Sequence, residues 1–161
     1  MSSENRRILV VDDDPASCEL VAYFLKSLGY DVAIAPDGGR ALNMNLDDEI
    51  ELVILDFHMP VYDGPQVLAM LRRRRLDRQV KVLALTADES EESREEMDRE
   101  GADGFLTKPV DLDALHDEVV RLMPGMAQRE GALHRRVRER RVELALSSRT
   151  FDRRRHLWRD S

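Results

Sequence analysis

The sequence predicts a doubly wound α/β fold, in which helices cover both faces of a five-stranded parallel sheet. Two observations predict it. Five short apolar runs alternate with five segments of helical character, and four of the runs end on polar side chains. Such alternation favours parallel strands joined by right-handed crossovers. The predicted strands are residues 8–11, 31–35, 52–55, 80–85 and 104–107, and the predicted helices are residues 15–28, 40–46, 65–75, 90–100 and 112–122.

The first strand ends on three consecutive carboxylates, Asp12, Asp13 and Asp14. Asp14 and Pro15 have the pattern of a helix start, with Asp14 as the N-cap and Pro15 in the first turn. The apolar residues that follow recur at helical spacing: Cys18, Leu20, Val21, Phe24, Leu25 and Leu28. Asp14 therefore has a structural role, whereas Asp12 and Asp13 are left without one.

The third predicted helix, residues 65–75, buries Val67, Leu68 and Leu71 and ends on four consecutive arginines, residues 72–75. Cations suit the negative end of a helix dipole, so a solvated helix end is favoured over a nucleic-acid patch. The fourth helix is strongly acidic, and Met97 is nearly its only large apolar residue. We expect such a helix to be weakly anchored to the core.

Length and charge indicate one domain with an appendage. The chain has 161 residues, of which 42% are hydrophobic and 35% charged, which is typical of a globular protein and not of a disordered chain. Residues 1–123 carry 14 Lys and Arg against 27 Asp and Glu, whereas residues 124–161 carry 11 Arg against 5 acids. This change at Pro124-Gly125 predicts a domain over residues 1–124 and an Arg-rich extension over residues 125–161.

Three features indicate a cytoplasmic protein. No apolar run approaches the ~18 residues of a membrane span, and the first residues lack the apolar core of a signal peptide. Cys18 is the single cysteine, which rules out an intrachain disulfide and fits a reducing compartment. Its apolar neighbours favour buried packing over a reactive thiol.

The polar residues at four strand ends define a candidate site: Asp12 with Asp13, Asp56, Thr86 and Lys108. The carboxyl ends of parallel strands form one edge, where α/β proteins bind ligands. Adjacent carboxylates repel one another unless a cation lies among them, and oxygen ligands suit Mg²⁺. Lys108 and Thr86 suit a transferred phosphoryl group, which leaves Asp56 as a nucleophile that forms an acyl phosphate.

Residues 6–123 resemble the receiver domain of two-component response regulators, of the chemotaxis-regulator-like kind. The motifs that carry the resemblance occur in the family's order with similar spacing: Asp12-Asp13, Leu55-Asp56-Phe57-His58-Met59-Pro60, Asp63-Gly64, Ala84-Leu85-Thr86-Ala87 and Lys108-Pro109. The resemblance implies a flavodoxin-like (βα)5 fold. It also implies phosphorelay signalling, in which the protein catalyses only its own phosphorylation and dephosphorylation.

The resemblance assigns roles to the residues of the site. It implies that Asp56 is the phosphoacceptor and that Lys108 pairs with the phosphoryl group. Asp12, Asp13 and Asp56 are implied to hold Mg²⁺ together with the backbone carbonyl of His58.

The resemblance further implies a conformational switch. Thr86 is expected to follow the phosphoryl group and Phe105 to swing inward, while His58 and Asp88 flank the pocket where they are candidates for orienting a water molecule. The Lys108–Pro109 peptide bond is expected to be cis.

The partners implied are a sensor histidine kinase or phosphotransfer protein as donor, and a downstream protein that contacts residues 90–123. A phosphorylation-dependent homodimer is a further option, and no membrane association is expected. Two alternatives stay open within the family, a degenerate receiver that acts as a phosphate-independent interaction module and a DNA-binding regulator. A Mg²⁺-dependent phosphatase would need a second Asp two residues after Asp56, where this chain has His58.

The extension is too short for a usual winged-helix output domain. Residues 129–146 have partly helical periodicity with arginines between the apolar positions, which favours a solvated, partly helical tail. Two alternatives remain for this tail. It docks on the acidic domain or on a partner protein, or it binds nucleic acid through residues 129–159.

Overall fold

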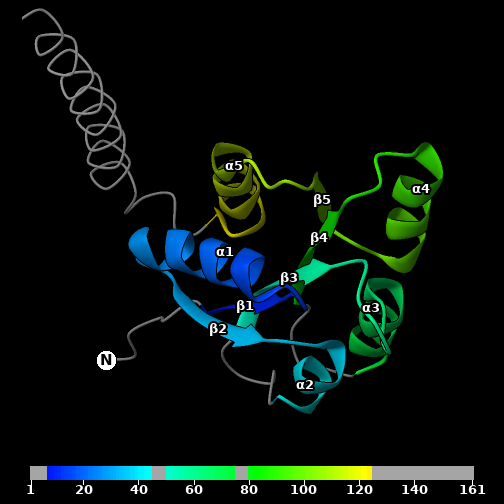
Figure 1. The fold of residues 1–161 in the computed structure, drawn as a ribbon. Helices are drawn as coiled ribbons and strands as arrows, with labels where there is room; N and C mark the ends of the chain where they lie inside the picture. Colours follow the sequence, from blue (N-terminus) through cyan, green and yellow to red (C-terminus); the bar gives the residue numbers. More distant parts are fainter. Residues whose placement is uncertain (1–6, 45–49, 75–79, 125–161) are drawn as a thin grey trace, which may run out of the picture. The chain divides into compact units, whose positions relative to one another are not determined.

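The computed structural model of the chain describes residues 7–44, 50–74 and 80–124. Its five strands form one parallel sheet in the order β2-β1-β3-β4-β5 (Figure 1). The strand bounds are Arg7–Val11 (β1), Asp31–Ala35 (β2), Ile50–Asp56 (β3), Lys81–Thr86 (β4) and Gly104–Thr107 (β5). This order reverses its direction between β1 and β3, and it confirms the predicted doubly wound, flavodoxin-like fold.

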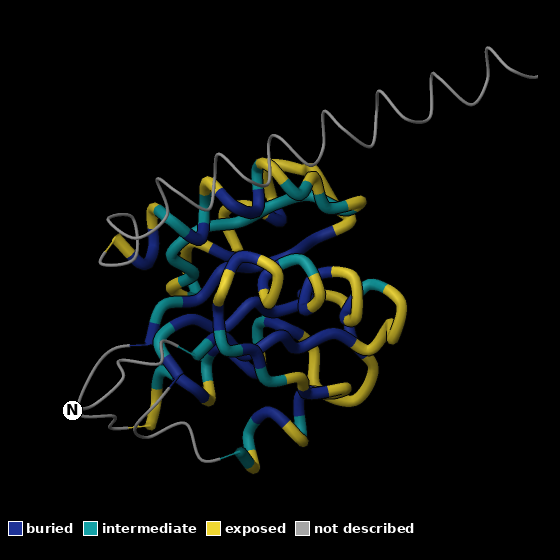
Figure 2. The backbone as a smooth tube through the Cα atoms, turned by 90° about the vertical axis from the view of Figure 1, so that its left-hand side faces the viewer, coloured by how far each residue is buried: buried dark blue, intermediate teal, exposed yellow. Residues whose placement is uncertain are grey.

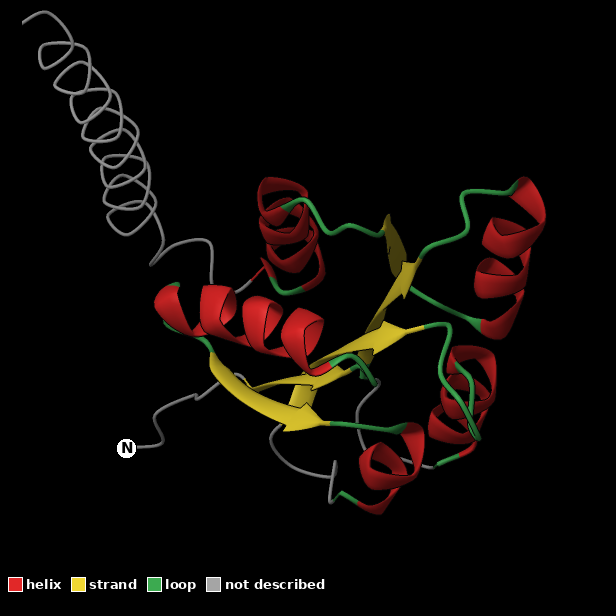
Figure 3. Cartoon of the chain, viewed as in Figure 1, coloured by secondary structure: helices red, strands yellow, loops and turns green. Residues whose placement is uncertain are grey.

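The five described helices cover the two faces of the sheet. α1 and α5 lie on one face, and α2, α3 and α4 lie on the other (Figures 1 and 3). Their bounds are Pro15–Ser27 (α1), Gly38–Asn43 (α2), Gly64–Arg73 (α3), Glu91–Glu100 (α4) and Leu112–Leu122 (α5). No helix in the described part of the chain is long and apolar enough to cross a membrane.

The central strands are buried, and Figure 2 shows these buried segments in dark blue at the centre of the domain. Ile8, Leu9, Leu52 and Val53 are all fully buried, with 0% of their surface exposed. A strand that helices cover on both sides has a continuous run of apolar residues. This explains why apolar and polar residues do not alternate in the sequence of these strands. The core thus fixes β1 and β3 firmly, and the residues at their carboxyl ends are held in place.

The predicted start of α1 is confirmed. Asp14 is the N-cap, its side chain accepts a hydrogen bond from the Ser17 backbone N–H at 3.3 Å, and Pro15 occupies the first turn. Cys18 is buried, as predicted, and burial raises the pKa of its thiol to about 11, which keeps it protonated. Leu20 lies away from the core and is 52% exposed, because Val21, Ala22 and Leu25 fill the face that packs on the sheet.

Several predictions fall outside the described residues. α2 ends at Asn43, and the predicted continuation to residue 46 enters residues 45–49, which are not described. α3 ends at Arg73, ahead of the predicted end at residue 75. The chain divides into two units, residues 1–124 and 125–161. The second unit lies outside the described residues, so its partly helical character and its nucleic-acid alternative stay predictions.

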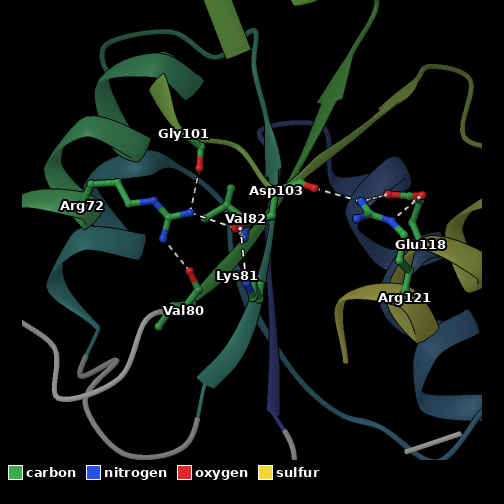
Figure 4. A network of polar contacts seen from close by, with 8 residues as sticks. All are labelled: Arg72, Val80, Lys81, Val82, Gly101, Asp103, Glu118 and Arg121. Atoms are coloured by element: carbon green, nitrogen blue, oxygen red, sulfur yellow. Dashed lines mark hydrogen bonds and ion pairs between the residues drawn. The ribbon is translucent and has the colours of Figure 1, made fainter. Parts of the chain in front are cut away.

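The prediction of a solvated arginine cluster at the end of α3 is wrong for Arg72. Its guanidinium donates to the carbonyl oxygens of Val80 at 2.5 Å and Gly101 at 2.8 Å and to Asp103 Oδ2 at 2.9 Å (Figure 4). The same Asp103 oxygen accepts the Val82 backbone N–H at 2.8 Å. Arg72 therefore joins the end of α3 to the start of β4 and to the end of α4.

Replacing Arg72 by alanine is expected to lower the free energy of unfolding by about 2 kcal/mol. The change leaves two carbonyl groups and a half-buried carboxylate without this donor, and hydrogen bonds to charged groups contribute about 1.5–3 kcal/mol. Chemical denaturation measures the effect. The matched control is Arg73→Ala on the exposed side of the same helix, which should change stability by less than ~0.5 kcal/mol. Equal losses in the two variants would contradict the structural role of Arg72.

Candidate functional site

Three carboxylates meet at the carboxyl edge of the sheet. Asp56 is the last residue of β3, and Asp12 and Asp13 directly follow β1. Asp12 and Asp56 are only 2% and 3% exposed, whereas Asp13 is exposed. One oxygen atom of each carboxylate lies within 4.8 Å of those of the other two. This compact set of oxygen donors fits a hard divalent cation such as Mg²⁺.

The expectation that Asp12 has no structural role is wrong, because this residue orders the turn after β1. Its Oδ1 accepts the Asp14 backbone N–H at 2.9 Å, and its own backbone N–H donates to the Ala35 carbonyl oxygen at 3.3 Å. The turn after β1 is thereby ordered, and Asp12 Oδ2 stays directed at the site, where it accepts from Lys108.

Lys108 follows β5 and brings a positive charge to the carboxylates. Its Nζ donates to Asp12 Oδ2 at 2.9 Å and lies 3.3 Å from Asp56 Oδ2. Burial alone would lower the pKa of Lys108, but the hydrogen bond to Asp12 and the charge of Asp56 outweigh it and raise the pKa. The ammonium group thus stays charged at neutral pH. The Lys108–Pro109 bond is cis, as expected.

Burial dominates the electrostatics of Asp56. It raises the pKa of this carboxyl to about 6, even though the His58 backbone N–H, which donates to Asp56 Oδ1 at 3.1 Å, and the charge of Lys108 both lower it. At neutral pH Asp56 is therefore mostly ionised but poorly solvated. A buried carboxylate of this kind gains from any additional positive charge, which favours cation binding beside it.

Thr86 is the last residue of β4 and is fully buried. Its hydroxyl accepts the Asp88 backbone N–H at 3.0 Å and donates to the Asp88 carbonyl oxygen at 3.2 Å. The His58 ring atom Nε2 lies 3.2 Å from the same hydroxyl oxygen. Asp88 itself is exposed, and its hydrogen bonds with Ser90 lower the pKa of its carboxyl.

Phe105 lies half-buried in β5, and Arg94 of α4 covers its ring. The guanidinium carbon of Arg94 is 4.9 Å from the ring centroid, within the range of a cation–π contact. α4 buries Ser93 and Met97 against the rest of the domain. Met97 is the one large apolar residue among them, in agreement with the prediction that α4 has few apolar contacts with the core. The contact of Arg94 with Phe105 also holds this helix in place, and the sequence did not predict it.

Gly64 holds the loop after Asp56 against the end of β3. Its backbone N–H donates to the Phe57 carbonyl oxygen at 3.1 Å, and a Cβ at this position would lie 2.5 Å from Phe57 Cα and 2.9 Å from the Asp56 carbonyl oxygen. The neighbouring Asp63 begins α3 with a capping box that it forms with Gln66. These contacts fix the path of the chain that carries His58.

Replacing Gly64 by alanine is expected to destabilise the fold by about 2 to 4 kcal/mol, because the new Cβ would overlap backbone atoms that cannot move without displacing β3. Thermal unfolding followed by circular dichroism measures the loss. Gly39→Ala is the matched control, since its Cβ would meet only side-chain atoms, at 3.3 Å or more. A Gly64→Ala protein as stable as the Gly39→Ala protein would contradict this close approach.

The predicted site residues come together. Asp12, Asp13, Asp56 and Lys108 form one cluster, and Thr86 and His58 are joined beside it. Phe105 lies in β5, the edge strand that ends directly before Lys108. Its ring contacts Arg94 of α4. Sequence reasoning missed the contact between the His58 side chain and Thr86, for which the sequence offers no local signal.

The chain belongs to the response regulator receiver domain family, whose model matches residues 8–120. It is 40% identical over 111 residues to the DNA-binding dual master transcriptional regulator RpaA of Synechocystis, and 40% identical over 114 residues to the sensor histidine kinase RcsC of Salmonella typhi. The matches cover 68% and 71% of this chain but only 45% and 12% of the relatives. The chain therefore spans less than half the length of these two relatives.

Solved structures support the same family. The chemotaxis protein CheY4 of Vibrio cholerae is 30% identical, with a TM-score of 0.68 over 73% of this chain and 98% of its own. The receiver domain of the sensor histidine kinase PA1611 of Pseudomonas aeruginosa is 28% identical, with a TM-score of 0.68 over 74% of this chain and 98% of its own. That structure holds a magnesium ion coordinated in its active site cleft. The predicted receiver resemblance is thus confirmed.

Proposed function

We propose that the chain accepts a phosphoryl group on Asp56 in a Mg²⁺-dependent reaction and thereby switches a surface that binds a partner. The observation that carries the proposal is the position of Lys108 Nζ, 2.9 Å from Asp12 and 3.3 Å from Asp56, within a cluster of three carboxylates. A charged donor and a cation site beside one buried carboxylate suit phosphoryl transfer, in which positioning and charge neutralisation supply most of the catalysis.

Each residue has a defined part in the proposed reaction. Asp12, Asp13, Asp56 and the His58 carbonyl would hold Mg²⁺, which when bound supplies positive charge to the phosphoryl oxygens. A carboxylate oxygen of Asp56 attacks phosphorus in line, the P–N bond of a phosphohistidine breaks, and the imidazole leaves with the bonding electron pair. Lys108 loses its pairing with the Asp56 charge and pairs with the new phosphoryl group instead.

The proposed output is a rearrangement at Thr86 and Phe105. Movement of Thr86 towards the phosphoryl group changes the space available to Phe105, whose ring contacts α4 through Arg94. A population shift between two packings would then alter residues 90–123, the proposed surface for a downstream protein or a second copy of the chain.

The proposed donor is a sensor histidine kinase or a phosphotransfer protein, and the proposed location is the cytoplasm. The protein would act only on itself, by forming and losing its own acyl phosphate. DNA binding through residues 129–159 is the second candidate. The name of the relative RpaA favours it, but the match covers only 45% of that regulator.

Intact-protein mass spectrometry tests the proposal. With Mg²⁺ and acetyl phosphate, the full chain should gain the mass of one phosphoryl group, and removal of the metal with EDTA should prevent the gain. Asp56→Asn should abolish it. If the protein gains no mass under conditions that phosphorylate another receiver domain in a parallel sample, it is a degenerate receiver that acts without phosphate.

A further inference from the structure

The hydroxyl of Thr86 has three polar neighbours within hydrogen-bonding distance. A hydroxyl group donates one hydrogen bond and accepts two. Thr86 donates to the Asp88 carbonyl oxygen at 3.2 Å, accepts the Asp88 N–H at 3.0 Å, and meets His58 Nε2 at 3.2 Å. The hydroxyl has one hydrogen, so the contact with His58 uses Nε2 as donor or as acceptor according to the tautomer of the ring.

We propose that His58 is a positioning residue that holds the Thr86 hydroxyl in its resting place and opposes the movement of Thr86 towards the phosphoryl group. This inference rests on the proposed function of Asp56. In the resting place the Thr86 hydroxyl is engaged by Asp88 and His58. The proposal requires that the His58 contact is broken when Thr86 moves.

The loop connects this contact directly to the phosphoacceptor. The backbone N–H of His58 donates to Asp56 Oδ1 at 3.1 Å, while the side chain of the same residue reaches Thr86, which lies 28 positions further along the chain. Consequently one residue contacts both the group that is phosphorylated and the group that responds. A substitution of the side chain leaves the backbone carbonyl and N–H of His58 in place.

The structure also provides room for the His58 ring to leave Thr86. The side chain is exposed, and it borders a cavity of about 400 Å³ that Met59, Asp88 and Ser93 also line. The His58 ring therefore has open space beside it. A contact that opposes the movement of Thr86 is one that exists in only one of the two conformations.

The size of the effect follows from the loss of one hydrogen bond in one conformation only. A net contribution typical of a single neutral hydrogen bond corresponds to roughly a 2- to 10-fold change in an equilibrium constant. His58→Ala should therefore shift the equilibrium by this factor towards the conformation in which Thr86 bonds the phosphoryl group. By linkage, ligands that prefer this conformation should bind more tightly by the same factor.

The test uses beryllofluoride with Mg²⁺, a phosphoryl mimic that binds a carboxylate reversibly, and titrates it into the full chain. The apparent affinity of His58→Ala should exceed that of the wild type by roughly 2- to 10-fold. His58→Gln retains a side-chain amide, which can donate or accept a hydrogen bond near the place of Nε2, so its affinity should lie closer to the wild type. In a Thr86→Ala background, which lacks the hydroxyl, His58→Ala should change the affinity by less than ~1.5-fold.

Two results would overturn the inference while leaving the proposed function intact. One is an unchanged or weaker affinity in His58→Ala, and the other is an equal effect of His58→Ala with and without the Thr86 hydroxyl. A role in orienting water alone would change the rate of acyl phosphate loss but not the affinity for the mimic, and such a result also counts against a positioning role. If the wild type neither binds the mimic nor gains a phosphoryl group, the proposed function itself has failed.

Discussion

Lys108→Ala is expected to slow the phosphorylation of Asp56 by at least about 100-fold, the loss typical when one group that stabilises a charged transition state is removed. The ammonium group lies 3.3 Å from Asp56 Oδ2, where charge accumulates on the oxygens of the incoming phosphoryl group. Rates of mass gain with acetyl phosphate and saturating Mg²⁺ measure the effect. Saturating metal keeps the carboxylates neutralised, so the rate reports the missing lysine.

The matched control for this variant is Lys81→Ala. Lys81 is the first residue of β4, and its Nζ lies 3.8 Å from Asp103, within the network of Figure 4 and apart from the carboxylate cluster. Its rate of phosphorylation should stay within ~2-fold of the wild type. A Lys108→Ala protein that is correctly folded and reacts as fast as Lys81→Ala would contradict the role of Lys108.

Asp56→Asn is expected to stabilise the fold at neutral pH, by about 2 to 3 kcal/mol in the absence of divalent cations. Burial raises the pKa of Asp56 to about 6 in the folded protein, from an ordinary value of 3.8. The folded state therefore binds this proton more tightly than the unfolded state. Stability falls as the pH rises from about 4 through about 6, and the loss is complete above that window. Asparagine carries no charge, so the Asp56→Asn protein does not lose this stability as the pH rises.

Denaturant unfolding at pH 4 and pH 7.5 in EDTA tests this expectation. The advantage of Asp56→Asn should be near zero at pH 4 and largest at pH 7.5. Mg²⁺ should reduce the difference, since binding to the folded wild type stabilises it. The control is Asp117→Asn on the exposed side of α5, which should change stability by less than ~0.5 kcal/mol at either pH. A destabilised Asp56→Asn protein at pH 7.5 would contradict the buried, raised-pKa carboxyl.

Local patterns were sufficient to predict the sheet and most of the site. The apolar runs that lead to Asp12, Asp56 and Thr86 are buried strands. The polar residue at the end of each run lies at the carboxyl edge of the sheet. Asp14 with Pro15 marked the start of α1 correctly. These features depend on residues that are neighbours in the sequence, so propensity and hydrophobic pattern carry the information.

Contacts between distant segments could not be predicted in this way. Arg72 bonds to Asp103, which lies 31 positions further along the chain. The His58 side chain contacts Thr86, which lies 28 positions further along. In the sequence Arg72 is one of four adjacent arginines, and nothing local distinguishes it from Arg73. Which arginine turns inward is decided by how α3 lies against β4 and α4. The exposure of Leu20 is a similar case, because helical spacing leaves the edge of the buried face undefined.

The central claim is that the phosphoryl group resides on the Asp56 carboxylate, and reductive trapping tests it most directly. Borohydride reduces an acyl phosphate to an alcohol, which converts the phosphorylated aspartate to homoserine. After treatment with Mg²⁺ and acetyl phosphate, peptide sequencing by mass spectrometry should find homoserine at position 56. Homoserine at position 12 or 13, or phosphate that resists borohydride, would contradict the account.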